Sequence, residues 1–184
     1  MKLGIFVAVL MLAGCGMHRE MPSLVGAARD GNVELIRTLI QQGADPNERA
    51  GVNGWTPLMH AIHKDQKGAV VALLDGGADV NARGDGGSNP LLMAAGYGYA
   101  DIVGILLDHK ADPHVQMNNG DNALNMAILG VSDIDRFTMG DCQNDALRVL
   151  VERVPDLKLH DSPAAAAKLK GCAGMSKLLG MRYP

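Results

Sequence analysis

Aromatic side chains are scarce in this chain of 184 residues. Trp, Tyr and Phe together make up 3% of it, as one Trp, three Tyr and two Phe. A hydrophobic core built from stacked rings is therefore excluded, and small aliphatic side chains must do the packing. Because the hydrophobic content is nevertheless 47%, the composition predicts one globular domain with a substantial core.

The chain also lacks an excess of basic residues. It has 17 Lys and Arg against 20 Asp and Glu, which gives a formal net charge of −3. A surface that binds nucleic acid needs clustered positive charge to neutralise phosphates, so this balance argues against nucleic acid as the main partner.

Signatures of catalysis are missing as well. The sequence has no Gly-x-Ser-x-Gly elbow, no Gly-rich phosphate loop with a Lys-Ser/Thr finish, and no His-Glu-x-x-His motif. We therefore expect a protein that is not an enzyme and that carries no cofactor.

The one long apolar run stands at the N-terminus. After the positive charge of Lys2, residues from Leu3 to Ala13 are almost all apolar. This run is shorter than the roughly 20 residues of a membrane-spanning helix and fits the roughly 7 to 15 residues of a signal peptide. It ends in Leu12-Ala13-Gly14-Cys15, which resembles the lipobox of bacterial lipoproteins.

The lipoprotein resemblance implies a location at the bacterial cell envelope. In that family, residues 1–14 would be removed as a signal peptide and Cys15 would be acylated, which anchors the mature chain to a membrane through a linker of residues 15–22. Gly16 stands where the family's inner-membrane retention signal has Asp, so the resemblance implies the outer membrane, facing the periplasm. An ordinary secreted protein with a Cys at this position is the alternative.

Lipidation of the first cysteine leaves Cys142 and Cys172. In an oxidising compartment these two residues are candidates for a disulfide that closes a loop of about 30 residues. Two free buried thiols are the alternative.

A period of 33 residues runs through the interior. Three glycines, three leucines and three alanines recur at this spacing: Gly54, Gly87 and Gly120; Leu58, Leu91 and Leu124; Ala61, Ala94 and Ala127. The unit opens with a segment such as Trp55-Thr56-Pro57-Leu58-Met59-His60-Ala61 and closes with one such as Gly77-Ala78-Asp79-Val80-Asn81. These motifs resemble ankyrin repeats, whose unit of about 33 residues starts with Thr-Pro-Leu-His-x-Ala and ends with Gly-Ala-Asp-x-Asn.

The resemblance implies an all-α solenoid that spans residues 23–184. It consists of four helix-turn-helix repeats at about 24–52, 53–85, 86–118 and 119–160, followed by a degenerate capping repeat at 161–184. Thr-Pro favours the start of a first helix, because the hydroxyl caps it and the fixed φ of Pro suits its first turn. Gly43 and Gly77 are expected to end second helices in the left-handed conformation. Lys110 replaces the next such glycine and predicts a looser turn in the third repeat.

One segment is not required by this architecture. Residues 131–144 replace about three residues of the pattern between the two helices of the fourth repeat. A functional role and the harmless drift of a surface loop are equally open for this insertion.

The resemblance also implies a binding surface. In ankyrin-repeat proteins the concave side, made of turn tips and first helices, is the usual site for a protein partner. Carried over to this sequence, with one residue added from the insertion, the candidate partner-binding residues are Asn53, Trp55, His60, His63, Asp85, Ser88, Met93, Tyr97, Asn118, Asp121, Met126 and Phe137.

Trp55 is the candidate that the repeat motif explains least. It is the only Trp in the chain and occupies a tip position that Ser88 and Asp121 fill in the next two repeats. The fold does not require a ring there, and exposed aromatic residues often anchor interfaces. The alternative is that Trp55 lies flat over the neighbouring tip as packing.

These features together predict a lipid-anchored, monomeric ankyrin-repeat protein that binds an envelope-resident protein or an effector acting on the membrane. A narrower form of this hypothesis is an immunity or inhibitor lipoprotein that neutralises a membrane-targeting toxin or lipase. An alternative from another class is a metal- or redox-active envelope protein that uses His60 and His63, or Cys142 and Cys172. Because no third ligand is evident beside the two histidines, we expect no metal site. A purely structural envelope lipoprotein is a third possibility.

Overall fold

The computed structural model describes residues 23–51, 53–130, 132–133, 136–137, 144–170 and 173–180. In these residues ten α-helices follow one another in pairs. They are α1 (Leu24–Asp30), α2 (Val33–Gln41), α3 (Pro57–His63), α4 (Lys67–Asp75), α5 (Pro90–Tyr97), α6 (Ala100–Asp108), α7 (Ala123–Leu129), α8 (Asn144–Arg153), α9 (Pro163–Lys170) and α10 (Ala173–Gly180). A short 3-10 helix, η1 (Asp85–Gly87), lies between α4 and α5.

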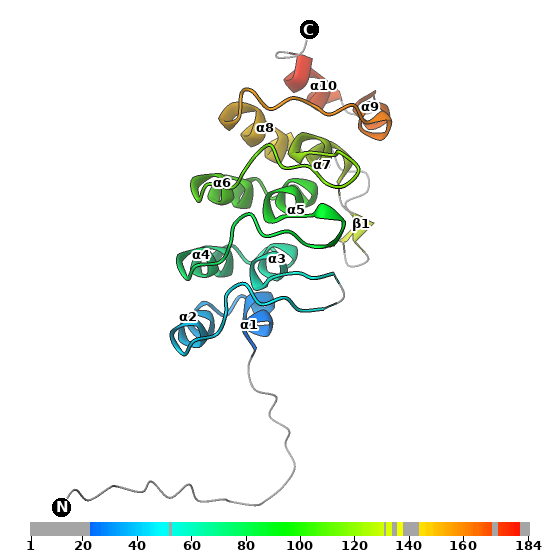
Figure 1. Ribbon diagram of the computed structural model, residues 1–184. Helices are drawn as coiled ribbons and strands as arrows, with labels where there is room; N and C mark the ends of the chain where they lie inside the picture. Colours follow the sequence, from blue (N-terminus) through cyan, green and yellow to red (C-terminus); the bar gives the residue numbers. More distant parts are fainter. Residues whose placement is uncertain are drawn as a thin grey trace, which may run out of the picture.

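The helix pairs stack into a solenoid (Figure 1). The first helices α1, α3, α5 and α7 form one column and the second helices α2, α4, α6 and α8 form the other, so each helix contacts its counterpart in the next pair. The α9–α10 pair closes the stack, with α9 against α7 and α10 against α8. The predicted all-α solenoid of four repeats and a terminal pair is therefore confirmed.

First helices begin at polar caps, as the sequence pattern predicts. The side-chain oxygens of Ser23, Thr56 and Asn89 accept hydrogen bonds from backbone N–H groups in the first turns of α1, α3 and α5, at 2.9, 3.4 and 2.8 Å. Asn122 caps α7 in the same way, with bonds of 3.0 and 3.2 Å. These bonds satisfy N–H groups that have no partner inside the helix.

The core lies between the two columns and is made of aliphatic side chains. Ala61, Ala94 and Ala127 are fully buried, and the periodic residues Leu58, Leu91 and Leu124 are at most 1% exposed. The small alanine side chains let neighbouring helices approach closely, which is why the stack is dense without rings.

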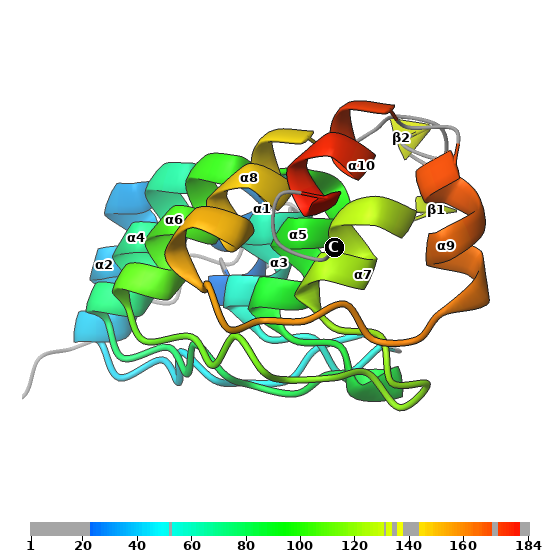
Figure 2. The same cartoon turned by 90° about the horizontal axis from the view of Figure 1, so that it is seen from above.

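The loops between repeats run along one side of the stack (Figure 2). Each tip is a tight turn closed by a backbone hydrogen bond, from Ala50 to Trp55, from Gly84 to Ser88, and from Met117 to Asp121. Neighbouring tips are joined as well, because Asp85 N–H donates to Asn53 and Asn118 N–H donates to Gly86, both at 3.1 Å. The tips therefore form a continuous ledge beside the first helices.

The expectation of a looser turn at Lys110 is wrong. Lys110 adopts the left-handed conformation, with φ 68°, as Gly43 and Gly77 do at 95° and 91°. Its N–H donates to Leu107 at 3.1 Å, which matches the bond from Gly77 to Leu74 at the same distance. The turn keeps its shape because the stacked helices fix it, and the Lys110 backbone is therefore held in a strained left-handed conformation.

This strain gives a prediction on stability. A left-handed backbone costs a residue with a Cβ about 1 kcal/mol or more, so Lys110→Gly is expected to raise the free energy of unfolding by about 0.5–1 kcal/mol after the flexibility of glycine is discounted. Gly77→Ala is the matched opposite. A Cβ at Gly77 would meet no atom within 4 Å, so its expected loss of about 1 kcal/mol comes from the backbone alone. Urea unfolding measures the free energy of unfolding of both variants. A higher free energy of unfolding in Gly77→Ala would contradict this prediction.

Part of the insertion is described. Strands β1 (Ser132–Asp133) and β2 (Arg136–Phe137) pair antiparallel, with Ser132 opposite Phe137. Asn144, the last residue of the insertion, begins α8. The remaining residues of this segment, Cys142 among them, lie outside the described residues, as do Cys172, Cys15 and the predicted signal peptide and linker. In the described part of the chain, no helix has the length and apolar character needed to cross a membrane.

Candidate partner-binding site

A row of five rings crosses the second and third repeats at the first helices. We call Trp55, His60, His63, Tyr97 and Tyr99 the aromatic row. The Trp55 ring centre lies 5.4 Å from that of His60 and 5.3 Å from that of His63. His63 lies 5.7 Å from Tyr97, which stacks on Tyr99 at 5.5 Å. The row therefore joins α3 to α5 and to the start of α6.

The row follows from the register of the repeats. His60 and His63 are three residues apart on α3 and so share one face of that helix. His63 and Tyr97 are 34 residues apart, about one repeat, and His63 Nδ1 lies 2.8 Å from the Tyr97 hydroxyl in a hydrogen bond. Stacked repeats place such positions against one another.

Trp55 is held at the start of the row by its backbone. It pairs with Ala50 across the first tip in an antiparallel bridge. Its ring also reaches the next tip, because a Cβ built on Gly84 would lie 3.2 Å from Trp55 Cδ1. Trp55 is half-buried, so it packs against the neighbouring tip and still presents part of its ring to solvent.

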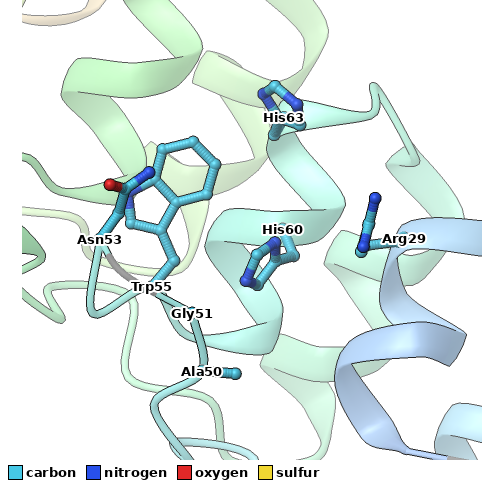
Figure 3. Close-up of a pocket in the computed structure, with 7 residues that line it drawn as sticks. All are labelled: Arg29, Ala50, Gly51, Asn53, Trp55, His60 and His63. Atoms are coloured by element: carbon cyan, nitrogen blue, oxygen red, sulfur yellow. The ribbon is translucent and has the colours of Figure 1, made fainter.

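A hollow of about 230 Å³ lies between Trp55 and α1. Its lining consists of Arg29, Ala50, Gly51, Asn53, Trp55, His60 and His63. In Figure 3 the Trp55 ring lies on one side of the hollow and Arg29 on the other, with the His60 ring between them. Arg29 is exposed, whereas Nε2 of His60 is buried and has no hydrogen-bond partner among the described residues.

Burial lowers the pKa of His60 below its usual value. The positive charge of Arg29 and the neighbouring His63 lower this pKa further, while a hydrogen bond with the Ala50 backbone opposes the shift. The His60 imidazole is therefore neutral at neutral pH, with one ring nitrogen as a donor and the other as an acceptor.

The structure distributes the other predicted residues over different environments. Asn53, Asp85 and Asn118 are exposed at the tips, and Ser88 and Met126 are half-buried. The side chain of Phe137 lies outside the described residues.

Three of the predicted residues are buried, so the expectation that their side chains are exposed is wrong. Met93 and Tyr97 are 5% exposed and Asp121 is 7% exposed. Met93 belongs to the core, the Tyr97 hydroxyl is bonded to His63, and an Asp121 carboxylate oxygen accepts a bond of 2.8 Å from the Asn119 amide. Tyr97 therefore positions the His63 ring, and Asp121 positions the Asn119 amide.

Sequence reasoning missed Arg29. Gly31 and Asp65 end the turns after α1 and α3 in the left-handed conformation and are 34 residues apart. Arg29 therefore occupies in α1 the position that His63 occupies in α3. The unit motif is degraded in the first repeat, so the motif does not align Arg29 with the later repeats. The spacing of the two turns at Gly31 and Asp65 is the signal that aligns Arg29 with His63.

The described residues include no group of three His, Cys, Asp or Glu side chains placed to hold a metal ion. His60 and His63 both line the hollow, but its other lining residues offer no carboxylate or thiolate to complete a zinc site.

Several known proteins are similar to parts of this chain. It is 36% identical over 72 residues to the 2-5A-dependent ribonuclease of Mus musculus, which is 39% of this chain and 10% of that protein. A putative ankyrin repeat-containing protein of Treponema pallidum is 33% identical over 78 residues, 42% of this chain and 26% of that protein. An ankyrin repeat-containing protein of Schizosaccharomyces pombe is 30% identical over 77 residues, 42% of this chain and 37% of that protein. The chain thus spans only a minor part of each relative.

A model of the family described as ankyrin repeats in three copies matches residues 5–84 and 24–119. The two overlapping ranges together cover more than half of the 184 residues. They include the helix pairs, tips and aromatic row from α1 to α6. This chain therefore belongs to the ankyrin-repeat family.

Proposed function

We propose that this protein is a lipid-anchored, non-enzymatic member of the family that captures a protein partner at the bacterial envelope. Ankyrin repeats are a general protein-binding fold, and the solenoid offers its tips and first helices as one extended surface. The aromatic row carries the proposal for the site, because it ends in the half-buried ring of Trp55, at a tip position where the next two repeats have Ser88 and Asp121. Trp and Tyr are the side chains that most often anchor interfaces.

The proposed anchor restricts the kind of partner. It rests on the lipobox-like segment that ends in Cys15. From Cys15 to Leu24 the chain has nine steps, which span at most about 30 Å when fully extended. The solenoid would thus stay near the bilayer, and its partner would be an envelope protein or an effector that acts on the membrane.

Trp55→Ala tests the surface. In cells that produce the full-length protein, this variant is expected to recover at least about tenfold less partner after cross-linking and purification, because an interface anchor is lost. Its helical far-UV circular dichroism should not change, since Trp55 is half-buried and packs at the edge of the core. Leu107→Ala is the matched control, because it shortens a half-buried apolar residue on the second-helix column. Equal partner yields from the two variants would refute this surface.

Cys15→Ser separates the anchor from the capture in the same cells. The variant should leave the membrane fraction while its purified solenoid still binds the partner found with the unchanged protein. A chain that stays in the membrane fraction would refute the anchor alone. Identification of the partner as a membrane-acting toxin or lipase would assign the narrower role of an immunity protein.

A further inference from the structure

The hollow beside Trp55 is lined by the positive charge of Arg29, which forms no ion pair with the described residues. Each of the other five arginines whose side chains are described makes an ion pair or a hydrogen bond: Arg37 with Glu34, Arg49 with the Gly54 and Arg83 carbonyls, Arg83 with the Gln116 carbonyl, Arg148 with Asp145, and Arg153 with Asp108. Arg29 makes neither with the described residues, and it lies at the rim of the hollow. Although the chain has a net charge of −3, Arg29 is thus an exposed cation with no ion pair among the described residues.

The other groups of the hollow complement this cation. Among the described residues, Nε2 of His60 is buried without a hydrogen-bond partner and no Asp or Glu lines the hollow. The Trp55 ring forms an apolar wall opposite Arg29. A guanidinium group matches the planar geometry of a carboxylate, and Nε2 of His60 becomes a further donor when the imidazole is protonated.

The size and charge of the hollow restrict its occupant. Its volume of about 230 Å³ is below the roughly 300–1,000 Å³ of pockets for drug-sized ligands and suits one amino-acid side chain. One fixed positive charge beside a neutral imidazole matches a monoanion better than a phosphate dianion.

We propose that the hollow binds a carboxylate of the partner protein, supplied by an Asp or Glu side chain, between Arg29, His60 and Trp55. This inference rests on the proposed function, because it names the chemistry that the captured protein presents to the aromatic row. A bound carboxylate would favour the protonated form of His60, so the affinity rises as the pH falls. Besides the bound carboxylate, the charged or titratable groups acting on His60 are Arg29 from α1 and His63 on its own helix.

Trp55 makes a direct test possible, because it is the only Trp in the chain and its fluorescence reports on the hollow alone. The α-amide of N-acetylglutamate, which keeps the side-chain carboxylate alone and is called N-acetylglutamate below, is expected to change this fluorescence saturably when it is added to the full-length protein. We expect saturation in the millimolar range typical of a single small group. The α-amide of N-acetylglutamine, which has nearly the same shape and no carboxylate, should not. An equal response to both probes, or no saturable response to N-acetylglutamate, overturns the proposal. A tighter response to inorganic phosphate overturns the choice of a carboxylate.

Arg29→Gln removes the charge from an exposed position and should weaken N-acetylglutamate binding at least about tenfold. Arg148→Gln, an equally simple change on α8, should leave the binding unchanged. NMR titration of the His60 ring supplies a second readout. Its pKa should rise in Arg29→Gln, because a repelling charge is lost, and should rise in the unchanged protein when N-acetylglutamate is present. A His60 pKa that does not respond to N-acetylglutamate overturns the proposal.

The outcomes separate this inference from the proposed function. If the protein captures its partner through Trp55 but N-acetylglutamate does not bind, the carboxylate site is refuted and the capture stands. If N-acetylglutamate binds as expected but Trp55→Ala captures as much partner as Leu107→Ala, the proposed surface is refuted.

Discussion

Replacing Leu91 by alanine is expected to lower the free energy of unfolding by about 2–5 kcal/mol. Leu91 is 1% exposed on α5, in the middle of the first-helix column. This helix packs against both α3 and α7. Truncation removes buried apolar surface and leaves a cavity that the stacked helices on both sides prevent from collapsing.

The position of Leu91 makes the loss a global one. Repeats contact only their neighbours in a solenoid, so stability depends on the interfaces between successive pairs. A cavity in α5 weakens both of its interfaces and so uncouples the N-terminal pairs from the C-terminal pairs. We expect urea unfolding followed by circular dichroism to become broader as well as earlier, because the halves no longer unfold as one unit.

Leu107→Ala serves as the control for this prediction as well. Leu107 lies on α6 in the second-helix column and is half-buried. The same truncation therefore creates little cavity and should lower the free energy of unfolding by about 1 kcal/mol. Equal losses from Leu91→Ala and Leu107→Ala would contradict the assignment of the core to the space between the columns.

The repeat register predicts the helices and the core, but it does not predict exposure. His60, Met93 and Met126 occupy one register position, 33 residues apart. His60 and Met126 are half-buried whereas Met93 is 5% exposed. The sequence defines where a residue stands in its own repeat, while burial depends on which side chains the neighbouring repeats place over it. This is why Met93 was wrongly expected at the surface.

Arg29 and Lys110 illustrate two further limits of the sequence pattern. Arg29 belongs to a first repeat whose motif is degraded, so its place in the hollow depends on contacts with α3 and the first tip. Lys110 contradicts the local preference for glycine, yet its turn is retained because the packed helices on both sides outweigh a strain of about 1 kcal/mol. In both cases the tertiary context decides what the local sequence leaves open.

Asn125 attaches the terminal helix pair to the solenoid. It is fully buried on α7, where its Oδ1 accepts from the His160 N–H and its Nδ2 donates to the His160 carbonyl, both at 3.0 Å. Asn122 adds a bond of 2.6 Å from its Nδ2 to the Lys158 carbonyl. The segment between α8 and α9 is therefore held against α7 by asparagine side chains.

Asn125→Ala is expected to cost about 3 kcal/mol, because it leaves a backbone donor and a backbone acceptor of His160 without partners beside a buried position. The loss should concentrate in α9 and α10, which touch the rest of the chain mainly through α7 and α8. Native-state hydrogen exchange measures this directly. Amides of α9 and α10 should exchange faster, while those of α1 to α6 keep their protection.

Asn81→Ala is the matched control, because Asn81 makes the same pair of bonds at a more exposed position. Its Nδ2 donates to the Lys110 carbonyl at 3.4 Å and its Oδ1 accepts from Asp112 N–H at 2.8 Å, but the residue is half-buried. Water can replace its amide, so the cost should be about 1 kcal/mol. Faster exchange throughout the chain in Asn125→Ala would contradict the local effect and show that the terminal pair is coupled to all repeats. Equal losses in the free energy of unfolding for the two variants would show that burial does not set the strength of this attachment.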